Sequence, residues 1–190
     1  MQRYDYTDSL RRVLTAAARE AAALKHEHVS PEHFVLALAS SEDRMLLQVW
    51  PRLGIDPAEI RRATLARFPA GYAEHGDGEL SYTRSANRAI GFALSEASVL
   101  KDAEGLEPTH LLLGITHLGE EAATRILRDL GITSEQIRIV LADLRGHPLP
   151  KLAVVSIEIK IELRDGAAIQ QTFAGGDAEA LEFVRGYLFA

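Results

Sequence analysis

The chain has 190 residues, of which 47% are apolar, so it can bury a sizeable core as one domain or as one domain with an appendage. Its formal net charge of −6 argues against a nucleic-acid or anionic-membrane partner, since both need a cationic surface. Cysteine is absent, which excludes disulfide and thiol chemistry, and neither a signal peptide nor a membrane-spanning apolar run is found. We therefore expect a soluble, cytoplasmic protein.

The sequence contains an internal duplication. Residues 30–38 read SPEHFVLAL and return as EPTHLLLGI at residues 107–115, an offset of 77 that also relates the Leu-Gly-Ile stretches at 53–55 and 130–132. Upstream the offset is 76, as in the Tyr-Thr pairs at 6–7 and 82–83, so one residue is inserted near 101–105. The chain is therefore predicted to be a tandem duplication of a unit of about 75 residues.

Four helices are predicted in the first repeat. Thr7 or Asp8 caps a first helix, whose apolar residues follow one stripe as far as Leu24. Ser30 followed by proline begins a short, almost wholly apolar second helix, which we place at the centre of the repeat. A third helix covers about residues 43–53, and a capping-box-like sequence at 56–59 begins a fourth.

The same order of elements is predicted after a glycine-rich linker. Thr83 caps the first helix of the second repeat, Pro108 opens the short apolar one, Gly131 ends the third and Thr133 caps the last. Eight helices then form one domain over residues 1–146, with repeat one at 4–68, a linker at 69–80 and repeat two at 81–146.

A different pattern follows residue 146. Apolar and polar residues alternate over 155–163, Asp165-Gly166 indicates a hairpin, a second strand lies near 169–173, and Asp177 caps a final helix. A two-residue loop would place Ile169 and Phe173 on the face opposite Leu163, whereas a longer or bulged loop would align them. This ββα appendage over 151–190 is too small to be stable alone, so we expect it to dock on the repeats or on another chain. The predicted fold class is mainly α, an eight-helix pseudo-twofold bundle with this appendage.

The repeated pattern resembles a known family. An alanine-rich helix, an x-x-Glu-His motif before an apolar helix, and a Leu-Gly-Ile turn, present twice over about residues 4–145, resemble the Clp amino-terminal repeat domain. That domain is the mobile receptor of the Clp and Hsp100 protein-unfolding ATPases. The resemblance implies an all-α bundle that binds adaptors or unfolded substrates and passes them to an ATPase ring.

The ATPase itself is not encoded in this sequence. A phosphate-binding loop needs Gly-x4-Gly-Lys-Ser/Thr, and none of the four lysines follows a glycine. The resemblance then favours a stand-alone Clp-repeat protein, a chaperone-associated adaptor of a Clp protease or unfoldase that binds partner or client proteins. The alternatives are an excised N-terminal domain of a Clp ATPase, or a peptide- or small-ligand-binding sensor or scaffold that self-associates as a homodimer through its hairpin.

The resemblance also implies binding residues. Some members of the family bind phosphorylated arginine in two symmetry-related pockets, each formed by the threonine that starts a repeat's first helix and the glutamate of its Glu-His pair. Carried over by position, Thr7 groups with Glu32, and Thr83 groups with Thr109, where the glutamate is missing. A hydroxyl cannot replace a carboxylate at equal strength toward a guanidinium. The alternative role for Glu32 is that of a first-turn acid favoured by the helix dipole.

Two aromatic residues complete the candidate contacts. Tyr6 and Tyr82 stand just before the two helix starts, where each either contacts a partner or staples its helix to the core. Trp50 is assigned to the core.

We predict no metal, cofactor or catalytic residue. His26, His28 and His33 lie within eight residues, but the equivalence of His33 with His110 favours packed histidines bonded to backbone groups. No nucleophile motif is present. A hydrolase using His33 with Glu32 is disfavoured because adjacent helical side chains diverge by about 100°.

Overall fold

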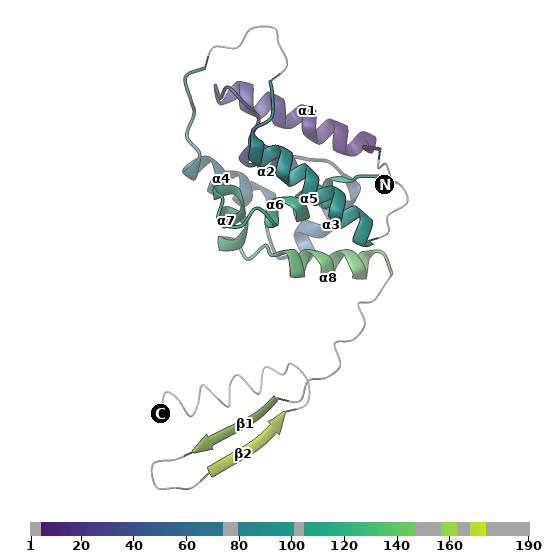
Figure 1. Cartoon of the computed structure of the whole chain (residues 1–190), viewed down its shortest axis with the longest axis vertical. Coiled ribbons are helices and arrows are strands. Elements are labelled where there is room, and N and C mark those ends of the chain that lie inside the picture. Colours follow the sequence, from purple (N-terminus) through teal and green to yellow (C-terminus); the bar gives the residue numbers. More distant parts are fainter. Residues whose placement is uncertain (1–4, 74–79, 101–104, 147–156, 163–167, 174–190) are drawn as a thin grey trace. The chain divides into compact units, whose positions relative to one another are not determined.

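The computed structural model describes residues 5–73, 80–100, 105–146, 157–162 and 168–173, and the chain divides into two compact units, Met1–Arg145 and Gly146–Ala190. The first unit holds eight described helices (Figure 1). They are α1 (Asp8–Ala23), α2 (Pro31–Ala39), α3 (Arg44–Arg52), α4 (Pro57–Arg67), α5 (Arg84–Leu100), α6 (Pro108–Thr116), α7 (Ala122–Asp129) and α8 (Ser134–Leu144). In the described part of the chain, no helix combines the length and the apolar composition that a membrane span requires.

The helices begin where the sequence places capping side chains. The Thr7 hydroxyl accepts a hydrogen bond from Leu10 N at 3.3 Å and begins α1, and the Asp43 carboxylate accepts from two backbone amides at the start of α3. Such caps satisfy amide groups that have no partner within the helix. The prediction of eight helices is confirmed.

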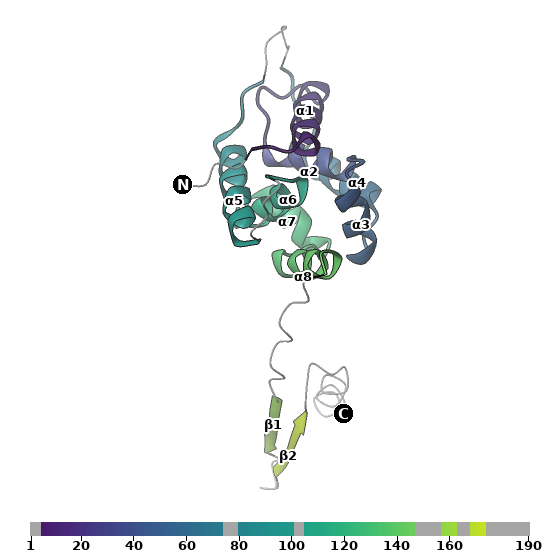
Figure 2. The ribbon, with the colours of Figure 1, turned by 90° about the vertical axis from the view of Figure 1, so that its right-hand side faces the viewer.

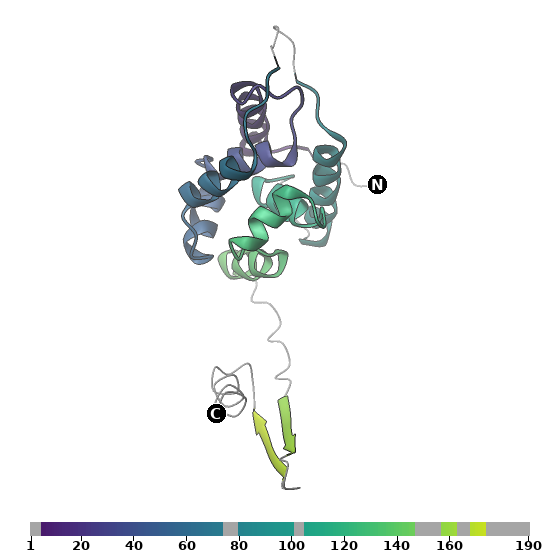
Figure 3. The same ribbon diagram turned by 90° about the vertical axis from the view of Figure 1, so that its left-hand side faces the viewer.

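The short helices α2 and α6 form the centre of the unit. Every residue of α2 is buried, and so is every residue of α6 except Thr116. Figures 2 and 3 show the other helices arranged around them. A helix that is apolar on all sides has to be buried on all sides, which is why these two helices occupy the core.

The two repeats contact each other reciprocally. Helix α3 of repeat one packs on α8 of repeat two, α4 packs on α7, and α2 packs on α6. An ion pair accompanies each of the two outer contacts: Arg67 Nη1 lies 2.6 Å from Asp129 Oδ2, and Arg52 Nε lies 3.6 Å from Asp143 Oδ2. Each repeat therefore covers the apolar surface that the other leaves open.

The segments that lead into the helices also cross between repeats. Tyr6 and Leu106 form a short parallel β-bridge, and so do Val29 and Tyr82. In the first, Thr7 N donates to Leu106 O at 3.1 Å; in the second, Val29 N donates to Ser81 O at 2.9 Å. The residue before the first helix of each repeat is thus bonded to the loop before the second helix of the other repeat.

A charged pair holds each repeat together. In repeat one, Arg61 Nη1 of α4 donates to Glu20 Oε1 of α1 at 2.6 Å, and also to Leu36 O at 3.1 Å and Ser40 Oγ at 2.8 Å. In repeat two the equivalent pair is Glu96 of α5 with Arg138 of α8, joined by His117 at the end of α6. Each arginine therefore ties the last helix of its repeat to the first and second.

The repeat-two pair is the more deeply buried of the two. The Glu96 side chain is only 7% exposed, and it accepts hydrogen bonds from Arg138 Nε at 3.1 Å and from His117 Nε2 at 2.8 Å. Burial raises the pKa of the Glu96 carboxyl, but the hydrogen bonds and positive charges of Arg138 and His117 outweigh it, so the pKa lies below its ordinary value. Glu96 is therefore ionised throughout the neutral range.

Helices α5 and α6 approach each other very closely at Gly114. A Cβ atom on Gly114 would lie 2.2 Å from Ala89 O and 2.8 Å from Ala93 N. Alanines at 86, 89, 93 and 97 form the facing stripe of α5, and all four are buried. Repeat one carries Ala37 at the position of Gly114, so α1 and α2 cannot come together in the same way.

The second unit contains two described strands, β1 (Ile157–Glu162) and β2 (Ala168–Phe173), paired antiparallel. Ile161 is opposite Ile169 and Ile157 is opposite Phe173. This register corresponds to the longer-loop alternative, because five residues separate the strands. Asp165-Gly166 and the predicted final helix lie outside the described residues, so the complete ββα appendage stays a prediction.

The close approach at Gly114 predicts a large effect of one methyl group. We expect Gly114→Ala to lower the free energy of unfolding by about 3 kcal/mol, because the backbone of α5 would have to move away. Gly91→Ala is the matched control, since Gly91 lies in the same helix pair and has open space around it. That variant should gain about 0.5–1 kcal/mol in urea unfolding experiments. Equal effects of the two substitutions would contradict the packing argument.

The Glu96 pair predicts a specific pH dependence. Because the folded-state pKa is lowered, the pair stabilises fully above the unfolded-state pKa of about 4.3, and this contribution is lost as the pH falls through the folded-state value. Glu96→Gln should cost about 2 kcal/mol at pH 7, and the difference from wild type should shrink below about pH 4. Urea unfolding at a series of pH values across this range measures the difference in the free energy of unfolding, with substitution of the exposed Glu27 by glutamine as the control. A difference that does not change with pH would refute the assignment.

Candidate functional site

The N-terminus of α2 holds a buried carboxylate. Glu32 is 8% exposed, and its Oε2 accepts a hydrogen bond from Ser30 Oγ at 2.6 Å. In the part of the chain that the structure describes, no other hydrogen bond or ion pair reaches this carboxylate. Tyr82 and Thr83 of repeat two lie beside the loop before α2, because Tyr82 forms a bridge with Val29 and Thr83 N donates to Val29 O at 2.9 Å. We call Ser30, Glu32, Tyr82 and Thr83 the α2 site.

Two hydrogen-bonded histidines lie next to the α2 site. Ser30 N donates to His33 Nδ1, which leaves His33 Nε2 to donate to His26 Nδ1 at 2.9 Å; His26 Nε2 then donates to Pro69 O at 2.9 Å. Burial, and to a lesser extent the charge of His26, lower the pKa of His33 to about 4. His33 is therefore uncharged at neutral pH and does not neutralise Glu32. The predicted backbone bond of the packed histidine is confirmed.

The N-terminus of α6 carries the same groups in exchanged order. Glu107 stands where repeat one has Ser30, and Thr109 stands where repeat one has Glu32. The hydroxyl again donates to the carboxylate, from Thr109 Oγ1 to Glu107 Oε2 at 3.4 Å, and Thr7 Oγ1 donates to Leu106 O at 2.9 Å. We call Tyr6, Thr7, Glu107 and Thr109 the α6 site.

A guanidinium of the same chain is bound in the α6 site. Arg145, the residue that ends α8, donates from Nη2 to Glu107 Oε2 at 2.8 Å, and both side chains are largely buried. The position equivalent to Arg145 in repeat one is Phe68. Its ring packs against His26 and His33, with centroids 4.5 and 5.0 Å away, and offers no charge to Glu32.

The predicted grouping of Thr7 with Glu32, and of Thr83 with Thr109, is wrong. Thr7 begins α1 and Glu32 lies beside the end of α1, where His26 meets His33; a helix of 16 residues separates these ends by about 24 Å. The segment that leads into the first helix of each repeat, which we call its entry segment, crosses to the other repeat. This crossing brings Thr83 to the loop before Glu32, and Thr7 to the loop before Thr109. Each site is therefore built from both repeats.

The aromatic candidates differ in their environment. Tyr82 is half-buried, and its ring packs on Phe34 with centroids 5.7 Å apart, so it does staple its repeat to the core. Tyr6 is 36% exposed and stands at the rim of the α6 site. Trp50 is buried, as predicted.

The histidines do not converge on one point. His28 Nδ1 bonds to Ser81 Oγ at 2.9 Å and so lies away from the His26–His33 pair. Among the described residues, no group of three or more metal-ligating side chains is found.

The sequence does not predict Glu107 and Arg145 as site residues. The signal was present, because aligning the repeats shows a carboxylate and a hydroxyl exchanged across two positions on either side of a proline. What the alignment cannot show is that the arginine at the end of α8 returns to this carboxylate. The geometry of the α2 site suits a cation that donates several hydrogen bonds, since a buried carboxylate needs a partner.

Three comparisons with known proteins agree on one family. Residues 5–130 match the model of the Clp repeat (R) N-terminal domain. The chain is similar to the negative regulator of genetic competence ClpC/MecB of Bacillus subtilis, with 28% identity over 142 residues, which is 74% of this chain and 17% of that protein. The chain thus spans about a sixth of that relative's length.

Solved structures show the same fold at low identity. The Hsp104 N-terminal domain of Candida albicans aligns with a TM-score of 0.61 and 19% identity, covering 75% of this chain and 93% of that one. A ClpV N-domain in complex with a VipB peptide aligns with a TM-score of 0.52 and 13% identity, covering 78% and 98%. With its duplicated four-helix units and its match over residues 5–130, the chain belongs to the Clp repeat N-terminal domain family.

Proposed function

We propose that this protein is a non-catalytic, cytoplasmic protein-binding module that serves as an accessory or adaptor of a Clp protease or unfoldase. Family membership supports the receptor role, and the ClpV N-domain with its VipB peptide is a fold relative that binds a segment of a partner protein. The charge of −6 suits binding of peptides rather than nucleic acid. The sequence offers no phosphate-binding loop for an ATPase of its own.

The observation that carries the proposal is the difference between Glu32 and Glu107. Glu107 binds the guanidinium of Arg145, whereas the carboxylate of Glu32 has no cation among the described residues. We propose that the α2 site takes an arginine side chain of a partner, with Tyr82 and Thr83 beside it. In the α6 site, with Tyr6, Thr7 and Thr109, a partner's arginine has to displace Arg145.

Glu32→Gln tests the α2 site. Fluorescence anisotropy with a labelled peptide that carries one arginine should show about tenfold to hundredfold weaker binding in this variant, because a charge-assisted bond is lost. Glu27→Gln, in the exposed loop before α2, is the matched control and should bind as wild type does. Parallel peptides with lysine or phosphoarginine separate plain charge from guanidinium and phosphate recognition. Unchanged binding by Glu32→Gln would rule out this site.

The adaptor role needs a separate experiment. Affinity purification of the full chain from its own cells should bring down a Clp ATPase or a Clp peptidase subunit, and Glu32→Gln should reduce the recovery of client proteins but not of the ATPase. If no Clp component is recovered, the alternative of a sensor or scaffold that acts without an ATPase takes its place.

The hairpin supports a proposal about self-association. In the described residues, β1 and β2 pair only with each other, so each strand has a second edge that can add another strand. We propose that the second unit mediates a homodimer. We also propose that the predicted final helix joins the two strands in a ββα appendage. Light scattering should give a dimer mass for the full chain and a monomer mass for a chain ending at Gly146. A monomer mass for both chains would show that the open strand edges do not mediate self-association.

A further inference from the structure

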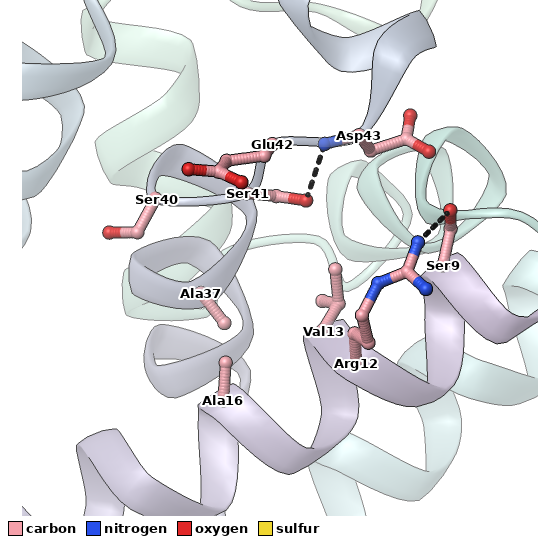
Figure 4. Close-up of a pocket in the computed structure, with 9 residues that line it drawn as sticks. All are labelled: Ser9, Arg12, Val13, Ala16, Ala37, Ser40, Ser41, Glu42 and Asp43. Atoms are coloured by element: carbon pink, nitrogen blue, oxygen red, sulfur yellow. Dashed lines mark hydrogen bonds between the residues drawn. The ribbon is translucent and has the colours of Figure 1, made fainter.

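Repeat one contains a cavity that is separate from the α2 site. It lies between α1 and the chain that leads from α2 to α3, has a volume of about 330 Å³, and is at the opposite end of α2 from Glu32. Figure 4 shows the methyl groups of Ala16 and Ala37 pointing toward each other, with Val13 to one side of them and the exposed Arg12 beside Ser9. Its lining residues are Ser9, Arg12, Val13, Ala16, Ala37 and residues 40–43.

The other repeat shows what this place accommodates. With the offset of 76, Ala16 corresponds to Phe92 and Arg12 to Arg88; with the offset of 77, Ser41 corresponds to Leu118. In repeat two the Phe92 ring packs against the core, and Leu118 is 3% exposed. A phenyl ring and an isobutyl group thus occupy the place where repeat one has a methyl group and a hydroxyl.

The cation at the rim is also duplicated. The Arg88 guanidinium lies over the Phe92 ring, with Cζ 5.9 Å from the ring centroid. Arg12 stands at the equivalent position of α1 and is exposed, and its Nη2 donates to the nearby Ser9 Oγ at 2.9 Å. A guanidinium over an aromatic face is a favourable arrangement, so Arg12 is placed to cover a ring that enters this cavity.

We infer that this cavity binds an aromatic side chain of a partner peptide, with the ring against Ala16 and Ala37 and the Arg12 guanidinium over its face. This inference rests on the proposed protein-binding function and adds a second contact to it. The cavity binds an apolar side chain, whereas the α2 site binds a charged one. The small residues of repeat one leave the space open, whereas Phe92 and Leu118 fill it in repeat two.

The test uses the ¹⁵N-labelled full chain and capped pentapeptides of alanine with phenylalanine, leucine or alanine at the centre. The phenylalanine peptide should shift the amide signals of Val13, Ala16, Ala37 and Ser41 in two-dimensional NMR spectra, with affinity in roughly the millimolar range. The alanine peptide should leave these signals unchanged. Because the probes contain no arginine, the result is independent of Glu32, and the two proposals can fail separately.

Two variants place a repeat-two residue at the equivalent position of repeat one. Ala16→Phe should abolish the shifts and raise the midpoint of thermal unfolding, because it fills an existing cavity; if it fails to fold, Ser41→Leu does the same with a smaller change. Arg12→Ala should weaken binding of the phenylalanine peptide roughly two- to fivefold, whereas substitution of the exposed Arg19 by alanine should leave this binding unchanged. The inference is overturned if folded Ala16→Phe still binds, if leucine binds as well as phenylalanine, or if the shifts lie elsewhere.

Discussion

Two short backbone bridges between the repeats determine how this molecule is assembled. Tyr6 pairs with Leu106 and Val29 pairs with Tyr82, so the entry segment of each repeat is bonded to the other repeat's central loop. Thr7 and Thr83 are thereby fixed beside the N-termini of α6 and α2, the two most buried helices. The core, the caps and both candidate sites depend on this crossing, and neither repeat contains a complete site.

Much of the fold could be predicted because it is encoded locally. Capping residues and prolines at first helical positions predict most of the helix starts, and glycines follow the ends of α3, α7 and α8. The apolar stretches predict that α2 and α6 are central. The Glu20–Arg61 and Glu96–Arg138 pairs are predictable in principle, because the glutamate recurs at the offset of 76 and the arginine at the offset of 77. Apolar periodicity alone does not predict these pairs, because it gives no weight to a charge that lies on the buried side of a helix.

The site was harder to predict than the helices. The sequence predicts that these residues lie at helix starts, but the family resemblance, carried over by position, groups Thr7 with Glu32 of the same repeat, whereas the chain crosses between the repeats. Sequence proximity gives no information about which of two equivalent loops an entry segment joins. Arg145 was overlooked for a related reason: its partner Glu107 is 38 positions away, and no local pattern links an arginine at a helix end to a capping glutamate.

The crossing of the entry segments has a consequence for synthesis of the chain on the ribosome. The Thr7 hydroxyl bonds to a carbonyl group 99 positions further along, which is made roughly 5–20 s later at ordinary elongation rates. During that interval α1 has its cap but not its neighbour, and the apolar α2 lacks α6 as a cover. A nascent repeat one therefore exposes the side of the apolar helix α2 that α1 and α4 do not cover, until the second repeat emerges.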